Sequence, residues 1–347
     1  MFFKGMDISF LEEVEHGGGT FGDRGHPEDA LKILQRHGVN AIRLRIWNDP
    51  PGEFCNLAHT LRMAQRIKAM GFYWLLDFHY ADSWADPGKQ PKPRAWSGLE
   101  GQVLDNAVRT YTADVLRALA EAQAAPDMIQ IGNEITNGFL WDSGRVGGPW
   151  DTDAQWSQFV NLLRAGVEGA QAGAGAHPPE VMLHIDRGGD NAGSRKFWDR
   201  IVDAGIPFDV MGLSYYPWWH GTLSALKGNL EDLAMRYRKD LIVVETAYPW
   251  TLSTGPNGHA MAPHDLAVHP GYPATVDGQA AFLRDLMQVV RSVPEDHGRG
   301  LYYWEPCWIP SQAAWSVGHP NNWANLALFD FSGGPLASLR AWNQVLN

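Results

Sequence analysis

Short apolar runs that end in polar residues recur along the chain. Met128 to Ile131 is followed, after one glycine, by Asn133 and Glu134, and Leu241 to Val244 is followed directly by Glu245. A fully apolar run of this length is typical of a buried parallel strand, and polar residues placed directly after it lie at the carboxyl end of that strand. The pattern predicts a parallel sheet with polar side chains at the ends of its strands.

Eight segments have this character, and most are separated by stretches with the 3.6-residue period of an amphipathic helix. The predicted strands are residues 4–10, 40–47, 72–78, 128–131, 181–185, 209–214, 241–245 and 299–304. The predicted helices are residues 26–37, 57–70, 107–122, 156–171, 223–237, 275–290 and 336–346. Eight strands alternating with helices in 347 residues predict an α/β fold, a (β/α)8 TIM barrel, as a single domain over residues 1–347.

Composition narrows the class of ligand. The net charge is −11, which argues against nucleic acids and anionic membranes as partners. The chain has 16 tryptophans, most of them beside glycine, proline or polar residues. Because aromatic faces stack on sugar rings, this usage favours a carbohydrate ligand, with a tryptophan-rich core as the alternative.

Cysteine usage and the N-terminus bear on the compartment. Cys55 and Cys307 are the two cysteines, too few for a disulfide framework, and two free thiols are expected, although one bridge stays open. The chain opens without a charged segment followed by an apolar stretch, and no apolar run is long enough to cross a bilayer. We therefore expect a cytoplasmic protein, or a secreted one if an export signal has been removed. The oligomeric state stays open.

Two glutamates at the ends of two strands, both near tryptophans, indicate a glycoside hydrolase, since these enzymes work with a pair of carboxyl groups. In the second predicted strand, period-2 alternation puts Arg43 and Arg45 on one face. An inward arginine needs a carboxylate or a ligand. Arg45 is nearer the end of the strand, so we predict that it holds a catalytic glutamate ionised, with a structural salt bridge as the alternative.

Other polar residues mark the ends of further strands. His79 ends the third strand in a segment with Asp82 and Asp86, and we expect it to contact the ligand. A metal site there is not expected, because no second histidine stands at ligand spacing. His184 and Asp186 end the fifth strand.

The sixth strand runs into two consecutive tyrosines, Tyr215 and Tyr216. A tyrosine in this position can donate its hydroxyl to a nearby carboxylate, and we select Tyr215 for the site. One of the two is expected to pack at the rim only.

Eight stretches spread along the chain match the motifs of a known family. The matching stretches are KGMDIS at Lys4, IRLRIWNDP at Ile42, LLDFHYADSWADPGKQ at Leu75, IGNEITNGFLW at Ile131, GLSYYPWWHGTL at Gly212, VVETAYPW at Val243, YWEPCWIP at Tyr303 and NLALFDFSG at Asn325. With these stretches the chain resembles the endo-β-1,4-galactanases, glycoside hydrolase family 53, in a large clan of retaining (β/α)8 hydrolases.

The resemblance implies a catalytic pair. Glu134 would be the acid/base and Glu245 the nucleophile, and the substrate would be β-1,4-galactan, the galactose side chain of pectin, or oligosaccharides derived from it. No cofactor is implied. Some bacterial relatives bind a structural calcium ion in their late loops, but residues 311–322 carry no carboxylate here, so we do not expect calcium.

Further residues are expected to bind the substrate. Asn133 would hydrogen-bond the 2-hydroxyl of the sugar, and Trp304 would stack near the cleaved bond. The full set of predicted substrate-binding residues is Asp7, Arg45, His79, Trp84, Asn133, His184, Asp186, Tyr215, Trp219, Trp250 and Trp304. The alternatives are a mannanase or xylanase of the same clan, a non-catalytic sugar-binding barrel, and a metal-dependent barrel such as an isomerase.

Overall fold

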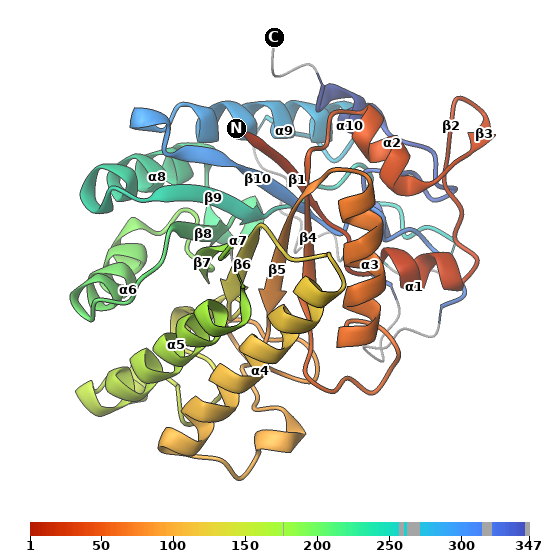
Figure 1. Cartoon of the computed structure of the whole chain (residues 1–347). Helices are drawn as coiled ribbons and strands as arrows, with labels where there is room; N and C mark the ends of the chain where they lie inside the picture. The colour runs from red at the N-terminus through yellow and green to blue at the C-terminus, as the bar shows by residue number, and fades with distance from the viewer. Residues whose placement is uncertain (176, 257–259, 262–270, 314–320, 344–347) are drawn as a thin grey trace. The chain divides into compact units, whose positions relative to one another are not determined.

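The computed structural model describes residues 1–175, 177–256, 260–261, 271–313 and 321–343. Its eight parallel strands form a closed barrel in the order β1-β10-β9-β8-β7-β6-β5-β4 (Figure 1). They are β1 (Phe3–Asp7), β4 (Ala41–Ile46), β5 (Tyr73–Phe78), β6 (Met128–Ile131), β7 (Glu180–Ile185), β8 (Val210–Ser214), β9 (Asp240–Glu245) and β10 (Gly298–Trp304). The predicted (β/α)8 barrel is confirmed, with every strand in the predicted place to within a few residues.

The helices between the strands agree less closely with the prediction. They are α1 (Leu11–His16), α2 (Ala30–Arg36), α3 (Leu57–Ala69), α4 (Gly101–Glu121), α5 (Asp153–Gly173), α6 (Asn191–Asp203), α7 (Pro217–His220), α8 (Leu223–Tyr237), α9 (Val276–Arg291) and α10 (Ala337–Ala341). Helix α6 was not predicted, because its N-terminal half is polar or small and its apolar face comes from residues nearer its C-terminal end. The predicted last helix also takes in residues 344–346, which lie outside the described part of the chain.

The start of α2 was predicted too early. His26–Pro27 forms β3, which pairs with β2 (Gly22–Asp23) in a separate two-stranded sheet. The helix begins only after Asp29, whose side-chain carboxylate accepts hydrogen bonds from the backbone N–H groups of Leu31 and Lys32. Asp29 is therefore an N-cap residue, a position that favours aspartate.

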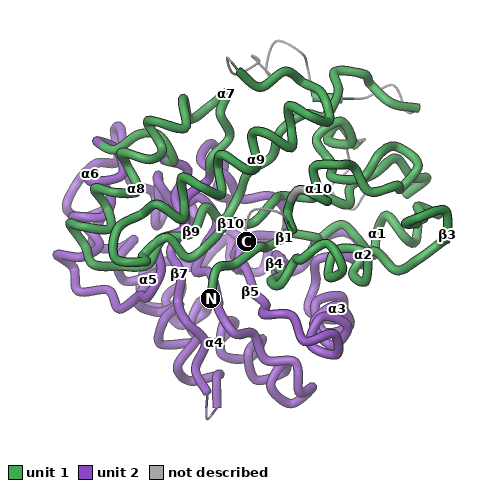
Figure 2. The backbone as a smooth tube through the Cα atoms, turned by 90° about the horizontal axis from the view of Figure 1, so that it is seen from above, with its two compact units in different colours: residues 1–43, 188–191, 215–347 green, residues 44–187, 192–214 purple. Residues whose placement is uncertain are grey.

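The chain divides into two compact units, coloured separately in Figure 2. The first unit comprises residues 1–43, 188–191 and 215–347, and in it β1 pairs with β10 and with the start of β4. This register sets Asp7 beside Trp304 on one side and beside Arg43 on the other. The single domain that the length predicts stays a prediction.

The second unit comprises residues 44–187 and 192–214, and it contains β5 to β8 as consecutive parallel neighbours. The register pairs Phe78 with Ile131, Gln130 with Met182 and His184 with Gly212. The ends of β5, β6 and β7 are thus neighbours in the sheet, although more than 100 residues of sequence separate the end of β5 from the end of β7.

Both cysteines, Cys55 and Cys307, are buried and free, as expected. Among the described residues, no helix combines the length and the apolar character needed to span a membrane.

Gly5, in the middle of β1, leaves room for an aromatic ring. It is the register partner of Tyr302 in β10, and a Cβ atom added at Gly5 would lie 2.3 Å from Cδ1 of that buried ring. Because overpacking a filled core is destabilising, Gly5→Ala is expected to lower the free energy of unfolding by about 1–3 kcal/mol. Chemical denaturation measures the change.

The matched control is Gly98→Ala, since a Cβ atom added at Gly98 meets no atom within 4 Å. This variant is expected to stay within about 0.5 kcal/mol of the parent protein. Equal stability of the two variants would contradict the close packing of β1 against Tyr302.

Candidate active site

Glu245 is the last residue of β9, and its side chain has a donor at each carboxylate oxygen. Nη1 of Arg43 lies 2.8 Å from Oε1, and the hydroxyl of Tyr216 donates to Oε2 over 3.1 Å. Glu245 is only 6% exposed and Arg43 is buried. A guanidinium and a hydroxyl that both bind the charged form stabilise Glu245 as a carboxylate.

Arg43 is itself held in place by a second carboxylate. The same Nη1 lies 2.8 Å from Oδ2 of Asp7, and Oδ1 of Asp7 accepts hydrogen bonds from the backbone N–H and the hydroxyl of Ser9. Asp7 is fully buried. We predicted Asp7 as a substrate-binding residue, and the structure shows it orienting the arginine that contacts Glu245.

Arg43 is thus an arginine beside Glu245, and the choice of Arg45 for a contact with a catalytic glutamate stays a prediction. The choice was based on nearness to the end of the strand, whereas the pairing of β4 with β1 sets Arg43 next to Asp7. The guanidinium carbon of Arg45 lies 4.5 Å from the ring centroid of Trp84 and 5.4 Å from that of Trp47. Arg45 thus packs over aromatic faces in a cation–π arrangement.

The choice between the two tyrosines needs correction. Tyr215 donates its hydroxyl to the carbonyl oxygen of Gly221 over 2.8 Å, and its ring stacks on Phe282 of α9. Burial raises the pKa of the Tyr215 hydroxyl. Successive side chains in extended backbone point to opposite sides, so Tyr216 contacts Glu245 while Tyr215 packs outward.

Three tryptophans of the first unit were predicted to bind the substrate, and the structure shows how accessible their surroundings leave them. Trp304 ends β10, and its ring centroid lies 4.8 Å from that of Trp323, which in turn lies 6.0 Å from that of Tyr216. Trp219 is 57% exposed, so its ring is free to stack on a sugar. Trp250 is half-buried, donates its indole N–H to the carbonyl of Ala324 and packs on Phe331, so less of its ring is accessible.

Glu134 lies three residues after the end of β6, in the second unit. Its backbone is left-handed, with φ 48° and ψ 51°, a conformation that costs a non-glycine residue about 1–2 kcal/mol. The hydroxyl of Ser214, at the end of β8, donates to Oε1 over 2.6 Å, and the backbone N–H of Glu134 donates to Nδ1 of His184 over 3.3 Å. A neutral hydroxyl thus donates to Oε1 of Glu134, whereas a guanidinium lies beside Oε1 of Glu245.

Two buried glutamines hold the backbone and neighbours of Glu134. The amide nitrogen of Gln130, inside β6, donates to Oδ1 of Asp77 over 2.7 Å and lies 3.2 Å from Oδ1 of Asn133. The amide nitrogen of Gln90 donates to the backbone carbonyl of Asn133 over 2.7 Å. Neither glutamine was predicted as a site residue. Gln130 could have been found from the sequence, because it is a polar residue inside an otherwise apolar run.

Asn133 and His184, both predicted to bind substrate, lie in the same cluster. Asn133 donates its side-chain amide to the carbonyl of Ala85 over 2.8 Å, and its Oδ1 lies 3.0 Å from Nδ1 of His184. His184 is fully buried, so it acts from beneath Glu134 rather than as a direct contact of the substrate.

His79 and Asp186, both predicted to bind substrate, have hydrogen-bond partners within the protein. Nε2 of His79 lies 3.0 Å from Oδ2 of Asp77, and its Nδ1 accepts from the indole N–H of Trp47 and the backbone N–H of Ala85. Both ring nitrogens are used within the protein, and the predicted contact of His79 with the ligand stays a prediction. It holds the segment that carries Trp84.

Asp186 accepts a hydrogen bond from the hydroxyl of Thr136, two residues after Glu134. Its backbone N–H donates back to the same oxygen over 3.2 Å. Asp186 therefore fastens the end of β7 to the segment that follows Glu134.

No group of three or more histidine, cysteine, aspartate or glutamate side chains suited to a metal ion occurs in the part of the chain that the structure describes. Residues 314–320, within the segment considered for calcium, lie outside that part.

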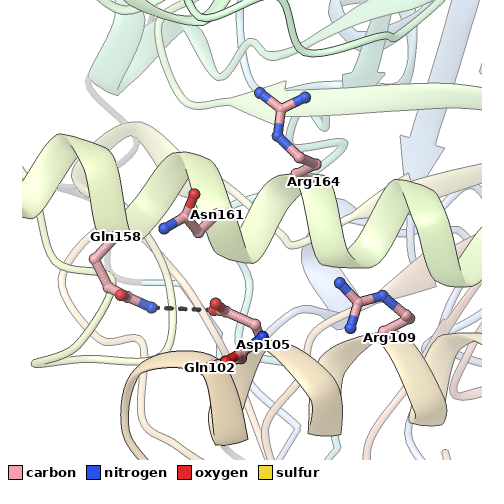
Figure 3. A pocket seen from close by; sticks show the side chains of 6 residues that line it. All are labelled: Gln102, Asp105, Arg109, Gln158, Asn161 and Arg164. Atoms are coloured by element: carbon pink, nitrogen blue, oxygen red, sulfur yellow. Dashed lines mark hydrogen bonds between the residues drawn. The ribbon is translucent and has the colours of Figure 1, made fainter.

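A hollow of about 340 Å³ lies elsewhere in the second unit, between α4 and α5 (Figure 3). It is lined by Gln102, Asp105, Arg109, Gln158, Asn161 and Arg164. Arg109 is paired with Glu168 over 2.6 Å, and Gln158 donates to Asp105, whose carboxyl pKa is raised by burial. The lining has no aromatic ring for a sugar and no residue from a strand end, so this hollow is not part of the candidate site.

The two glutamates thus differ in the way that glycoside hydrolysis requires. Glu245 is stabilised as a carboxylate by Arg43, which suits a nucleophile, while Oε1 of Glu134 binds a neutral hydroxyl, which suits a group that gains and loses a proton.

Comparisons with known proteins agree with this chemistry. The model of glycosyl hydrolase family 53 matches residues 3–342. A Niallia circulans protein described as "Uncharacterized protein in bgaB 5'region" is 56% identical over 98% of this chain and 93% of its own length. A probable arabinogalactan endo-β-1,4-galactanase A of Aspergillus terreus is 40% identical over 88% of this chain and 86% of its own. The solved GH53 catalytic domain of Ignisphaera aggregans superposes with a TM-score of 0.92 at 40% identity, covering 100% of this chain and 96% of that one.

Proposed function

The chain belongs to glycosyl hydrolase family 53, and from this premise we propose that it hydrolyses the β-1,4-galactosidic bonds of galactan. The substrate class is type I arabinogalactan, the galactan of pectin, or galacto-oligosaccharides derived from it. Relatives described as arabinogalactan endo-β-1,4-galactanases support this substrate. The single observation that carries the proposal is the family match over residues 3–342.

Glu245 is the nucleophile in the proposed mechanism. Its carboxylate attacks the anomeric carbon, the bond from that carbon to the leaving oxygen breaks, and a galactosyl ester of Glu245 forms. Arg43 and Tyr216 keep the carboxylate ionised and aimed before the attack. Asp7 supports this arrangement by orienting Arg43.

Glu134 is the proposed acid/base. It begins protonated and gives its proton to the departing glycosidic oxygen as the bond breaks. In the second step it takes a proton from the water that attacks the ester, so the sugar is released with its original anomeric configuration. Asn133 is proposed to bind the 2-hydroxyl, and Trp304, Trp219 and Trp84 to stack on sugar rings.

Release of reducing ends from β-1,4-galactan, β-mannan and xylan tests the choice of sugar. Hydrolysis is expected on galactan and on galacto-oligosaccharides, with little on the other two polymers. A preference for mannan or xylan would replace galactanase by one of the related activities that share the barrel and its two glutamates.

Tyr216→Phe removes the hydroxyl that donates to Oε2 of Glu245. A hydrogen bond to a charged group contributes about 1.5–3 kcal/mol, so kcat on galactan is expected to fall about tenfold or more. The control is Tyr215→Phe, which removes the neighbouring hydroxyl that binds the Gly221 carbonyl, and it is expected to keep kcat within about threefold. Steady-state kinetics of the two variants decide between the tyrosines, and a larger loss in Tyr215→Phe would reverse the assignment.

A further inference from the structure

One buried hydroxyl connects Glu134 to a buried imidazole. Oγ of Ser214 lies 2.6 Å from Oε1 of Glu134 and 2.8 Å from Nε2 of His184. Ser214 and His184 are both fully buried, and all three residues belong to the second unit. Since a serine hydroxyl has a single hydrogen, only one of these two contacts can receive it.

The ring proton of His184 decides which contact receives that hydrogen. The backbone N–H of Glu134 donates to Nδ1 over 3.3 Å, and the amide nitrogen of Gln130 lies 3.1 Å from the same atom. A backbone N–H can only donate, so the contact with Glu134 makes Nδ1 the acceptor and places the ring proton on Nε2. Nε2–H then donates to Ser214, and the hydrogen of Ser214 is left to donate to Oε1 of Glu134.

The opposite tautomer fits less well. Oδ1 of Asn133 lies 3.0 Å from Nδ1 and would accept from it, but Nε2 would then take the hydrogen of Ser214. Once Glu134 is ionised, Oγ of Ser214 would then face its carboxylate at 2.6 Å as a second acceptor, at the step in which Glu134 acts as the base. One hydrogen of the Gln130 amide goes to Asp77, and the other is shared among the carbonyl of Gly132, Nδ1 and Asn133 Oδ1, which all lie within 3.2 Å of the amide nitrogen.

We propose that His184 and Ser214 are positioning residues that reserve Oε1 of Glu134 as a hydrogen-bond acceptor and so confine its catalytic proton to Oε2. The inference depends on the proposed role of Glu134 as the acid/base. One imidazole thereby fixes both the backbone of Glu134, through Nδ1, and its carboxyl group, through Ser214.

The proton balance is simple. The Oε2 proton passes to the glycosidic oxygen while the ester with Glu245 forms, and the attacking water later returns a proton to Oε2. Ser214 and His184 keep their own protons throughout, and Ser214 donates to Oε1 in both states of Glu134. The carboxylate is therefore stabilised at the moment when it must act as a base.

Ser214→Ala tests the role in proton donation. Loss of a charge-assisted hydrogen bond is expected to lower kcat/KM on galactan about tenfold or more. On a 2,4-dinitrophenyl β-galactobioside, whose leaving group needs no proton, kcat/KM is expected to stay within about threefold of the parent. Ser214→Thr, which keeps a hydroxyl, is expected to recover most of the activity on galactan. An equal loss on both substrates, or no loss on galactan, would overturn the proposal.

Two further controls separate this role from packing. Ser194→Ala removes another buried hydroxyl, one that donates to the carbonyl of Arg187, and it should leave both substrates unaffected. In Ser214→Ala the alkaline limb of the kcat/KM profile on galactan should move to higher pH, since the carboxylate has lost a donor. The titratable groups of the surrounding cluster, Asp77, Asp186 and His184, are unchanged in this variant, and an unmoved limb contradicts the proposal.

A measurement without substrate distinguishes this inference from the proposed function. In 15N NMR spectra of imidazole-labelled protein, assigned by comparison with His184→Gln, His184 is expected to carry its proton on Nε2. The Nδ1–H form would overturn the inference whatever the activity. If the Nε2–H form is found and the parent protein does not cut galactan, the proposed substrate is wrong and the placement of the Glu134 proton stands.

Discussion

Glu245→Gln is expected to lower kcat on β-1,4-galactan by about 10⁴-fold or more, because the galactosyl ester cannot form without the carboxylate nucleophile. The amide is nearly isosteric with the carboxylate, its oxygen can accept from Arg43 and its NH2 group can donate to the hydroxyl of Tyr216, so binding should change little. The loss is therefore expected in kcat rather than in KM. Reducing-end assays at high enzyme concentration measure it.

The matched control is Glu231→Gln, a half-buried position on α8 whose carboxylate lies 3.7 Å from Nζ of Lys227. Surface ion pairs of this kind contribute about 1 kcal/mol or less, and this variant should keep full activity. Trapping with a 2-deoxy-2-fluoro galactosyl substrate gives a direct reading, since the peptide that contains Glu245 should gain the mass of the sugar. Labelling of a different carboxylate, or retention of more than about a tenth of the activity, would remove Glu245 from the nucleophile role.

Glu134→Ala is expected to lower kcat/KM on galactan by about 10²- to 10⁴-fold, the usual contribution of general acid catalysis. The effect should depend on the leaving group. A 2,4-dinitrophenyl β-galactobioside leaves without a proton, so formation of the ester should be nearly unaffected, and hydrolysis of the ester should become the slow step. Kinetics on the two substrates separate the acid role from the base role.

Added azide completes the test of Glu134. The space left by the missing carboxyl group admits this small anion, which attacks the galactosyl ester without needing a base. Turnover of the aryl substrate should rise with azide, and the product should be the β-galactosyl azide, the configuration that a double displacement gives. Glu121→Ala, an exposed change at the end of α4, should show neither effect. An α-azide product, or rescue in Glu245→Gln in place of Glu134→Ala, would exchange the two roles.

Glu245→Gln and Glu134→Ala together test whether the different surroundings of the two glutamates give them different roles, one as nucleophile and the other as acid/base. Glu245 binds a guanidinium that Asp7 holds, and Glu134 binds a hydroxyl that His184 holds. The first arrangement favours one charge state, whereas the second accommodates a proton that comes and goes.

The sequence by itself determined the barrel and the two glutamates. Apolar runs that end abruptly at Asn133-Glu134 and at Glu245 are local signals, because burial on both faces of a parallel strand requires an uninterrupted apolar segment. The boundaries of α8 follow from the same kind of local periodicity. Where the local signal was weak, as in α6 with its polar first half, the element was missed.

Only the tertiary structure decided which side chain touches which. Arg43 and Arg45 share a face by alternation, so no local pattern tells which of them lies beside Asp7, and the pairing of β1 with β4 shows that Arg43 does. In the same way, Ser214 is joined to Glu134 across 80 residues of sequence. Strand register sets such contacts, and register depends on the packing of the whole sheet rather than on the order of residues within one strand.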